Sequence, residues 1–164
     1  MGFAIATLEL GEGALGISPI PGGDGDVAEA VETISAWRAS LVLTLTEAHE
    51  LDAAGAQGLG TLLAEHQIAW WHRPIVDFQN PSEQEGVRWA ALCEDVAGQV
   101  AAGARVLIHC KGGCGRSGMV LLRVLLDGGE TPSDALARLR EVRPCAVETD
   151  AQMAWATHGV LTQA

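Results

Sequence analysis

The chain has 164 residues, of which 48% are apolar and 19% are charged, the balance of one globular domain that can bury a core. Its formal net charge of −11 argues against a general binding surface for nucleic acids or anionic membranes. An acidic chain that handles an anionic substrate must therefore concentrate positive potential at one place.

The first half of the chain predicts strands that alternate with short helices. Residues 3–20 alternate loosely and are rich in glycine, which predicts an edge hairpin within an N-terminal segment, 1–25. Asp24 or Asp26 can cap a helix that runs to about Arg38. The next expected elements are a strand at 41–45, short helices at 47–53 and 56–66, and a strand at 68–72.

The second half predicts one more strand and several helices. Residues 74–81 form a loop, after which Ser82 and Glu85 make a capping box for a long helix over about 83–102. The elements expected after it are a strand at 105–108, a glycine-rich turn at 112–115, a nearly all-apolar helix at 116–126, a helix that opens with Thr131 and Pro132 and ends at Val142, and a last helix at about 149–160.

This order of elements predicts an α/β fold in which a central mixed, mostly parallel sheet is flanked by helices on both faces. The pattern indicates one domain over residues 1–164. The helix at 116–126 is apolar nearly all round, so we expect it to be the buried central helix. Its N-terminus then opens at the carboxyl edge of the sheet, where α/β folds bind ligands.

The segment 106–118, which reads VLIHCKGGCGRSG, holds the residues suited to chemistry. A loop between Cys110 and Arg116, joining a strand to the central helix, can turn successive backbone N–H groups inward as a nest for an anion such as phosphate. Its glycines permit the backbone angles that this turn requires. The helix N-terminus adds unpaired donors and a partial positive charge. The expected substrate-binding positions are Lys111, Gly112, Gly113, Cys114 and Gly115.

Side chains in the same segment suit phosphoryl transfer. Arg116 offers a planar fork that pairs two phosphate oxygens at once. A cysteine at a helix N-terminus beside fixed positive charge is stabilised as the thiolate, so we expect Cys110 to attack phosphorus and form a phosphocysteine that water hydrolyses. Ser117 can donate a hydrogen bond to the departing thiolate, and we expect His109 to orient the loop. This mechanism needs no metal and no cofactor.

The motif His109-Cys110-x5-Arg116-Ser117 resembles the signature loop of the protein tyrosine and dual-specificity phosphatase superfamily. Its form, His-Cys-x-Gly-Gly-x-Gly-Arg-Ser, is especially similar to the kinase-associated phosphatase type. The resemblance covers about residues 40–160 and implies a single phosphatase domain with its catalytic core in that range. It also implies hydrolysis of a phosphate monoester, with a phosphorylated protein or a small phosphate ester as the substrate.

Residues 71–77, Trp-His-Arg-Pro-Ile-Val-Asp, resemble the family's acid loop, and Asp77 lies 33 residues before Cys110. The resemblance implies that Asp77 protonates the leaving oxygen and then acts as the base on the hydrolytic water. Proton transfer of this kind is typically worth about 10²–10⁴-fold in rate. Asp52 and Asp95 fall in predicted helices and fit this role less well.

The resemblance leaves the hydrolytic step and the substrate open. In tyrosine-specific members of the family, a glutamine near the start of the last helix positions the hydrolytic water. Here the first candidate position is Glu148, with Gln152 as an alternative, so the role is left unassigned. Residues 1–40 contain no recognisable phosphotyrosine-recognition loop, which favours a shallow and permissive pocket. Phosphotyrosine, phosphoserine or phosphothreonine, lipid and metabolite substrates all remain open.

Other functions fit the same residues less well. Gly113, Gly115 and Gly118 match the dinucleotide fingerprint G-x-G-x-x-G, but only 46 residues follow, too few for the rest of that fold. A rhodanese-like sulfur carrier needs no arginine six residues after its cysteine. A non-catalytic phosphate-binding module is the alternative from another class. Within the family, Lys111 keeps a phosphoinositide or other small-molecule phosphatase open, although such enzymes usually carry a second lysine where this chain has Cys114.

Two further predictions concern location and cysteine chemistry. Residues 1–10 carry no basic segment typical of a secretory signal, and no apolar run reaches membrane-spanning length, so we expect a cytoplasmic protein without membrane insertion. Its four cysteines are then expected to be mostly reduced, and their spacing is unlike a zinc site. Cys93 is predicted to lie in the core, and Cys145 has no assigned role. Cys114 is expected to be a small loop residue, although peroxide is predicted to link it to Cys110.

Overall fold

In the computed structural model, which describes residues 2–163, the chain folds around a five-stranded sheet of order β1-β2-β5-β3-β4. The strands are β1 (Ala6–Leu10), β2 (Gly13–Ser18), β3 (Leu41–Thr44), β4 (Ala69–His72) and β5 (Arg105–His109). β1 and β2 are antiparallel, whereas every other neighbouring pair is parallel. The prediction of a mixed, mostly parallel sheet is confirmed.

The predicted N-terminal hairpin lies at one edge of this sheet, but only its first strand is an edge strand. β2 pairs with β1 on one side and runs parallel to β5 on the other. All six residues of β2 are buried. The hairpin therefore contributes an interior strand next to the one that leads to Cys110.

The helices lie close to their predicted positions. They are α1 (Val27–Ala36), α2 (Ala48–Ala53), α3 (Leu59–Glu65), α4 (Gly86–Ala101), α5 (Gly115–Asp127), α6 (Pro132–Val142) and α7 (Asp150–Gln163), with a 3-10 turn, η1 (Glu83–Glu85), before α4. Asp26, rather than Asp24, caps α1, because its side chain accepts a hydrogen bond of 3.0 Å from the Glu29 N–H. The predicted capping box of Ser82 and Glu85 is present and starts η1.

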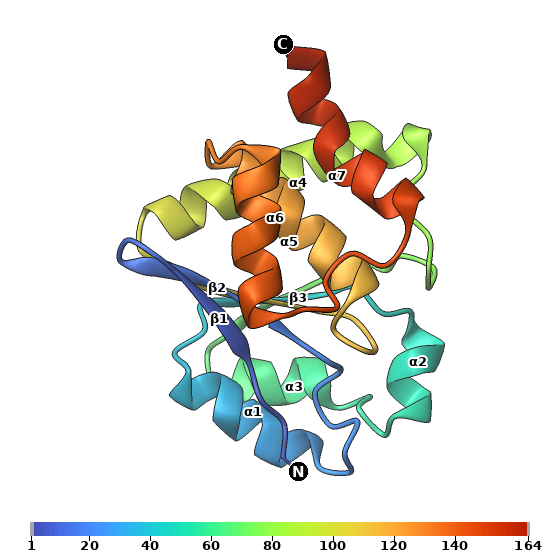
Figure 1. Ribbon diagram of the computed structural model, residues 1–164. Helices are drawn as coiled ribbons and strands as arrows, with labels where there is room; N and C mark the ends of the chain where they lie inside the picture. The colour runs from blue at the N-terminus through green and yellow to red at the C-terminus, as the bar shows by residue number, and fades with distance from the viewer. Residues whose placement is uncertain (1, 164) are drawn as a thin grey trace.

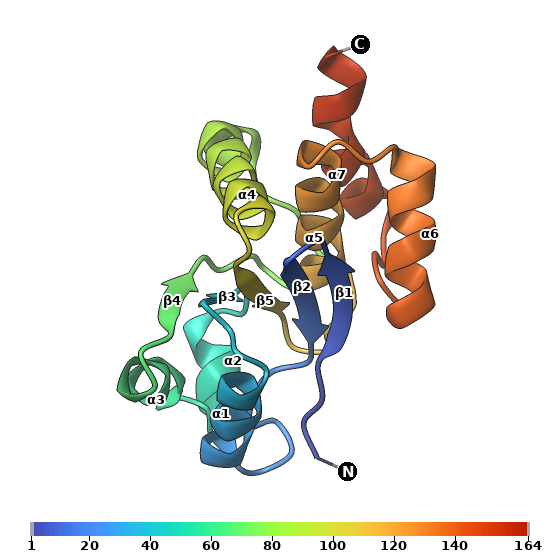
Figure 2. The ribbon, with the colours of Figure 1, turned by 90° about the vertical axis from the view of Figure 1, so that its left-hand side faces the viewer.

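Helices cover both faces of the sheet (Figures 1 and 2). α1 and α3 lie on one face, and α4, α5, α6 and α7 lie on the other. Side chains alternate along β5, so that Leu107 packs with the α1 and α3 core while Val106 and Ile108 pack with the α4 and α5 core. Because both faces of the sheet are buried, the sequences of its inner strands are nearly continuous runs of apolar residues.

α5 is the central helix that its apolar sequence predicted. All of its residues are buried except Arg123 and Asp127, which form an ion pair of 3.7 Å one turn apart. α4, α6 and α7 pack around α5 on the same face of the sheet. The N-terminus of α5 follows β5 after only a short loop and therefore opens at the carboxyl edge of the sheet.

The strand register brings distant segments together at that edge. His109 is aligned with Ser18 on one side and with Thr44 on the other, and Thr44 is aligned with His72. The segments that leave these residues are consequently neighbours, as expected for the ligand-binding edge of an α/β fold. Within residues 2–163, none of the helices has both the length and the apolar character needed to cross a bilayer.

Candidate active site

The loop of residues 110–116, called here the Cys110 loop, turns its carbonyl groups outward. The carbonyls of residues 111–114 accept hydrogen bonds of 2.8–3.0 Å from the Ile20 N–H, two Arg143 guanidinium nitrogens and the Val147 N–H. In a trans peptide unit the next N–H points opposite to the carbonyl, and no cis peptide bond occurs within residues 2–163. The N–H groups of residues 112–115 therefore face the inside of the loop and form the predicted nest.

Two glycines of this loop lie close to neighbouring segments, and one of them is required by the geometry. Gly113 has a φ of +75°, and an added Cβ would lie 2.6 Å from both Pro19 N and Ser18 C. At Gly115 an added Cβ would meet a carboxylate oxygen at the end of the exposed Glu148 side chain, which can turn aside. Gly113 is therefore the position where this loop needs glycine, both for the left-handed turn and for the close approach to the backbone of residues 18 and 19.

Cys110 and Ser117 lie together at the bottom of the loop. The Cys110 side chain is 3% exposed, and its sulfur lies 3.1 Å from the Ser117 hydroxyl oxygen. Because α5 begins at Gly115, its first N–H groups and the positive end of its dipole lie at the same place. The sulfur therefore lies beside a hydroxyl group and unpaired backbone N–H groups, all of which can donate hydrogen bonds into the loop.

Arg116 is 1% exposed and is held by a carboxylate that the sequence pattern did not reveal. Its Nη1 and Nη2 atoms donate to the two carboxylate oxygens of Glu50, both at 2.8 Å, and Nη1 also donates to the Ile75 carbonyl at 2.9 Å. Its Nε atom is buried and has no hydrogen-bond partner among the described residues. Burial alone lowers the pKa of Arg116, but the Glu50 hydrogen bonds and the surrounding negative charges outweigh it and raise the pKa.

Glu50 comes from α2, the short helix that follows β3. Its Oε2 also accepts a hydrogen bond of 2.8 Å from the Glu47 N–H, as part of the capping box that starts the helix. Burial raises the pKa of Glu50, but the hydrogen bonds from Arg116 and Glu47 and the Arg116 charge outweigh burial and lower it. The signal that could have revealed this residue is the spacing of Glu47 and Glu50 directly after a strand that ends at the ligand-binding edge.

Asp77 lies at the mouth of the site, where the resemblance placed it. Its Oδ1 atom lies 3.2 Å from Arg116 Nη2 and accepts a hydrogen bond of 3.0 Å from the Phe78 N–H. The Asp77 side chain is 45% exposed, so water and a substrate can reach it. Phe78 has a φ of +62°, a value rare for a bulky residue, which marks a tight turn just after the acid.

His109 connects the base of the loop to the sheet and remains neutral. Trp70 Nε1–H donates to the Thr44 hydroxyl at 2.7 Å, and that hydroxyl lies 2.7 Å from His109 Nε2. His109 Nδ1 lies 3.2 Å from the Cys110 carbonyl, which can only accept, so the ring proton belongs on Nδ1. Burial lowers the pKa of His109 to about 4. This arrangement fits the orienting role that the sequence predicted.

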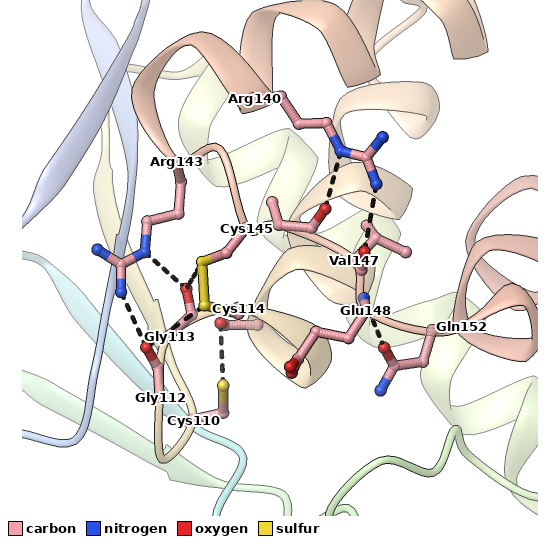
Figure 3. Close-up of a disulfide and its surroundings, with 12 residues drawn as sticks. Cys110, Gly112, Gly113, Cys114, Arg140, Arg143, Cys145, Val147, Glu148 and Gln152 are labelled. Atoms are coloured by element: carbon pink, nitrogen blue, oxygen red, sulfur yellow. Dashed lines mark hydrogen bonds between the residues drawn. A yellow bond between two sulfur atoms is a disulfide. The ribbon is translucent and has the colours of Figure 1, made fainter.

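A disulfide between Cys114 and Cys145 corrects the predictions made for the cysteines (Figure 3). Cys114 is not a lone small loop residue, this pair is not reduced, and Cys114 is not free to link to Cys110. The spacing of four residues was misleading because the Cys110 sulfur contacts Ser117, whereas the Cys114 sulfur meets the segment after α6. Cys93 lies in the core as predicted, where burial raises the pKa of its thiol to about 12.

Gln152, one of the two residues considered for positioning water, uses both ends of its amide in structural contacts. Its Oε1 accepts from the Glu148 and Thr149 N–H groups at 3.1 and 3.2 Å, and its Nε2 donates to the Gln79 carbonyl at 3.3 Å. The side chain is fully buried. It therefore caps the start of α7 and ties it to the loop that carries Asp77.

A cavity of about 1000 Å³ opens beside the site. Lys111, the only lysine in the sequence, is exposed and lines this cavity together with Arg143 and Asp77. Apolar and acidic side chains complete the wall, among them Phe3, Ile20, Val76, Asp24 and Glu47. The cavity is wider than a phosphate group alone requires.

Glu47, His49 and Glu50 on the cavity wall lie close enough together to hold a metal ion. However, both carboxylate oxygens of Glu50 already accept hydrogen bonds from Arg116. A cation would have to compete with a buried guanidinium for the same oxygens. The donor set therefore fits the ion pair with Arg116 better than it fits a metal.

Comparisons with known proteins agree on one kind of domain. A family model described as PTP-SAK, a Swiss Army Knife protein DSP-PTPase phosphatase domain, matches residues 24–155. The structure is similar to kinase-associated phosphatase with a serine in place of its catalytic-site cysteine, with a TM-score of 0.85 and 23% identity over 99% of this chain and 96% of that chain. No protein of the curated set matches the chain in sequence.

Two further solved structures extend the comparison. Tk-PTP in its active form has a TM-score of 0.69 and 28% identity, over 93% of this chain and 95% of that chain. PTPMT1 in complex with PI(5)P has a TM-score of 0.69 and 14% identity, over 97% of this chain and 99% of that chain. All three structures share the α/β fold described above.

Proposed function

The chain belongs to the DSP-PTPase phosphatase domain family, and from this premise we propose that it hydrolyses phosphate monoesters through a phosphocysteine intermediate on Cys110. The observation that carries the proposal is the convergence of a buried cysteine, a fixed arginine and an acid on one nest of backbone N–H groups. Asp77 lies 3.2 Å from Arg116, and the Cys110 sulfur lies 3.1 Å from Ser117. A module that only bound phosphate would need neither the cysteine nor the acid.

The first step of the proposed reaction begins with phosphate in the Cys110 loop. The N–H groups of residues 112–115, the start of α5 and Arg116 Nε hold its non-bridging oxygens. Because Asp77 and the phosphate approach the same guanidinium, phosphate binding releases Asp77 from its ion pair, and the freed carboxylate takes up a proton from solvent. The Cys110 thiolate attacks phosphorus, the ester bond breaks, and Asp77 gives its proton to the leaving oxygen.

The second step regenerates the enzyme. Asp77, now a carboxylate, takes a proton from water as the water oxygen attacks the phosphocysteine. The sulfur–phosphorus bond breaks, and the Ser117 hydroxyl donates a hydrogen bond to the Cys110 thiolate as it departs. His109, neutral and hydrogen-bonded to the Cys110 carbonyl, fixes the start of the loop during both steps. We assign Gln152 no part in positioning the water, because its amide is already committed.

For the substrate class we propose a phosphorylated protein. The open cavity of about 1000 Å³ has room for a polypeptide around the phosphorylated side chain. Its wall carries Asp24 and Glu47, which disfavour a head group with several phosphates, and Lys111 is its only lysine. Cys114 is committed to a disulfide at the position where phosphoinositide enzymes usually carry their second lysine. PTPMT1, solved with PI(5)P, shares the fold, so a phosphoinositide belongs in the test.

Turnover of p-nitrophenyl phosphate by the wild type and by Cys110→Ser tests the reaction. We expect the variant to lose at least about 10³-fold in kcat, because serine at this position is a far weaker nucleophile. Cys93→Ala, which removes the buried core cysteine, is the matched control and should retain turnover. Equal turnover by wild type and Cys110→Ser would refute the proposal. Phosphate binding without any turnover by the wild type would favour the non-catalytic module.

The same Cys110→Ser variant can trap the substrate. We expect it to retain phosphotyrosine, phosphoserine or phosphothreonine peptides more tightly than PI(5)P presented in vesicles. Lys111→Ala should weaken binding of every phosphorylated ligand to a similar degree if the lysine only adds positive potential. A loss confined to the lipid would instead identify Lys111 as a lipid-recognition residue and overturn the choice of a protein substrate.

A further inference from the structure

The segment of residues 143–148, called here the brace, supports the Cys110 loop from outside (Figure 3). Arg143 donates from Nε to the Gly113 carbonyl at 2.9 Å and from Nη2 to the Gly112 carbonyl at 2.8 Å. The Val147 N–H donates to the Cys114 carbonyl at 3.0 Å. Three successive carbonyls of the loop are therefore held outward by the brace, and their orientation is what turns the N–H groups inward.

The brace is held in place by α6 and packs against α5, so its position affects the Cys110 loop. Arg140 in α6 donates to the Ala146 and Val147 carbonyls, at 3.0 and 3.2 Å. Val147 packs directly against the first turn of α5, where an added Cβ at Gly118 would lie only 2.6 Å from the Val147 nitrogen. A displacement of the brace would thus reach both the loop carbonyls and the helix start.

The disulfide is the one covalent link between the brace and the Cys110 loop within the described residues. It joins Cys145, in the brace, to Cys114, the last loop residue before α5 begins. Cys145 is exposed and Cys114 is half-buried, whereas the free cysteines Cys93 and Cys110 are both buried. A redox reagent in solvent therefore meets this bond more readily than it meets either free thiol, and exposed disulfides of this kind are the labile ones.

We propose that Cys145 is a positioning residue for the Cys110 loop, and that the oxidation state of the Cys114–Cys145 pair sets how tightly the loop holds a phosphoryl group. This inference rests on the proposed function only in that the loop binds phosphate. With the bond formed, the loop is tethered to α6 through the brace. With the bond reduced, only the hydrogen bonds from Arg143 and Val147 keep the carbonyls outward, so the nest is less rigid and binds an anion less tightly.

The switching chemistry needs a dithiol in one direction and a peroxide in the other. A dithiol thiolate attacks the exposed Cys145 sulfur and expels the Cys114 thiolate, and the second thiol of the reagent then displaces Cys145. Two electrons pass to the protein, and the dithiol becomes a disulfide. In the reverse direction, peroxide oxidises one thiol of the pair to a sulfenic acid and releases water. The other thiol displaces the hydroxyl group as a second water and reforms the disulfide.

The test uses Cys110→Ser, so that oxidation of the catalytic cysteine does not interfere. Tungstate, a tetrahedral analogue of phosphate, is titrated calorimetrically against the oxidised protein and against protein reduced with excess dithiol. We expect reduction to weaken binding about 3- to 10-fold. The Cys110→Ser/Cys145→Ser double variant should bind like the reduced protein in both buffers. Because the double variant has no Cys114–Cys145 bond to reduce, its insensitivity to the reductant would assign the response of Cys110→Ser to this bond.

The outcomes separate this inference from the proposed function. Equal tungstate affinity in the oxidised and reduced states overturns the tether and leaves the phosphatase proposal intact. No binding in either state overturns both, because the loop would then not be a phosphate site. Peptide mapping of unreduced protein after thiol alkylation checks the bond itself, and alkylated Cys114 and Cys145 would also overturn the tether. In the otherwise wild-type enzyme, Cys145→Ser should raise KM for p-nitrophenyl phosphate more than it lowers kcat.

Discussion

Arg116 and Arg143 act on the same loop from its inner and outer faces, and they do so through different partners. Inside, Arg116 is buried and donates to the Glu50 carboxylate and the Ile75 carbonyl. Outside, Arg143 is half-buried and donates to the Gly112 and Gly113 carbonyls, which are neutral. The inner arginine is thus compensated by acid, whereas the charge of the outer one adds to the positive potential of the nest.

This difference explains how a chain with a net charge of −11 can offer a site for an anion. Glu50 and Asp77 are paired with the Arg116 guanidinium, and the loop carbonyls point outward and accept hydrogen bonds from outside the loop. Changes at the inner face should therefore act mainly on the chemical step and on the geometry of Arg116. Changes at the outer face should act mainly on phosphate affinity. Four predictions examine the two faces, from the largest expected effect to the smallest.

Replacement of the acid tests the inner face most directly. Asp77→Asn should lower kcat for an alkyl phosphate about 10²–10⁴-fold, because the leaving oxygen no longer receives a proton. The loss should be smaller for p-nitrophenyl phosphate, whose leaving group needs little protonation. Asp24→Asn, an exposed carboxylate of the same cavity, is the matched control and should change kcat little. A loss of equal size on both substrates would show that Asp77 acts through Arg116 rather than as the acid.

His109, at the base of the inner face, predicts a dependence of stability on pH. Its pKa falls from an ordinary 6.5 to about 4 because the ring is buried. Between these values the unfolded chain binds a proton that the folded chain does not, so stability falls as pH drops from 6.5 to about 4. The contribution amounts to roughly 3 kcal/mol, at about 1.4 kcal/mol per pKa unit.

Urea unfolding of wild type and His109→Gln across that range measures the effect. Glutamine can still hydrogen-bond to Thr44 but does not titrate, so the variant should show a flatter profile between pH 6.5 and 4. His49→Gln, which replaces an exposed histidine, should keep the wild-type slope. Parallel profiles for wild type and His109→Gln would contradict the assignment of a neutral buried ring.

Removal of the charge on Glu50 tests whether Arg116 needs its acidic partner. Glu50→Gln leaves one acceptor oxygen but no charge, so the guanidinium should be less well fixed and kcat/KM should fall about 10–100-fold. The pKa of Glu50 is lowered in the fold, so the pair stabilises above the ordinary glutamate pKa of 4.5 and this contribution is lost as pH falls below it. The variant should therefore lose less stability than wild type in that acid range. Glu65→Gln, on the exposed side of α3, should behave like wild type in both measurements.

The two faces also differ in how well the sequence predicted them. The inner face is carried by one continuous motif, in which Cys110, Arg116 and Ser117 lie within eight positions and a strand and a helix fix their geometry. The order of strands and helices was predictable for the same reason, because each element is set by local periodicity and caps. Asp77 was found only because a second motif accompanies it.

The outer face depends on contacts that form only after the chain has folded. Arg143 and Cys145 lie about 30 residues from their partners in the loop, and nothing in the local pattern after α6 marks them as neighbours of the site. Glu50, 66 residues from Arg116, was missed for the same reason. Distance along the chain misled the prediction most at Cys114. Cys110, four positions away, was predicted to link to it, whereas its partner in the structure is Cys145, 31 positions away.

Arg143→Lys tests the outer face and is expected to have the smallest effect of the four substitutions. Lysine keeps the positive charge but replaces the fork by a single ammonium group, so at least one of the two carbonyl hydrogen bonds is lost. One such bond is worth about 1 kcal/mol, and we expect tungstate affinity to fall about 5-fold. kcat should change less than affinity, because the Arg143 guanidinium donates to the Gly112 and Gly113 carbonyls and not to Cys110 or Asp77. Arg88→Lys, on the exposed face of α4, controls for the substitution itself. A fall in kcat with unchanged affinity would mean that the outer face takes part in the chemical step, and the division between the two faces would have to be abandoned.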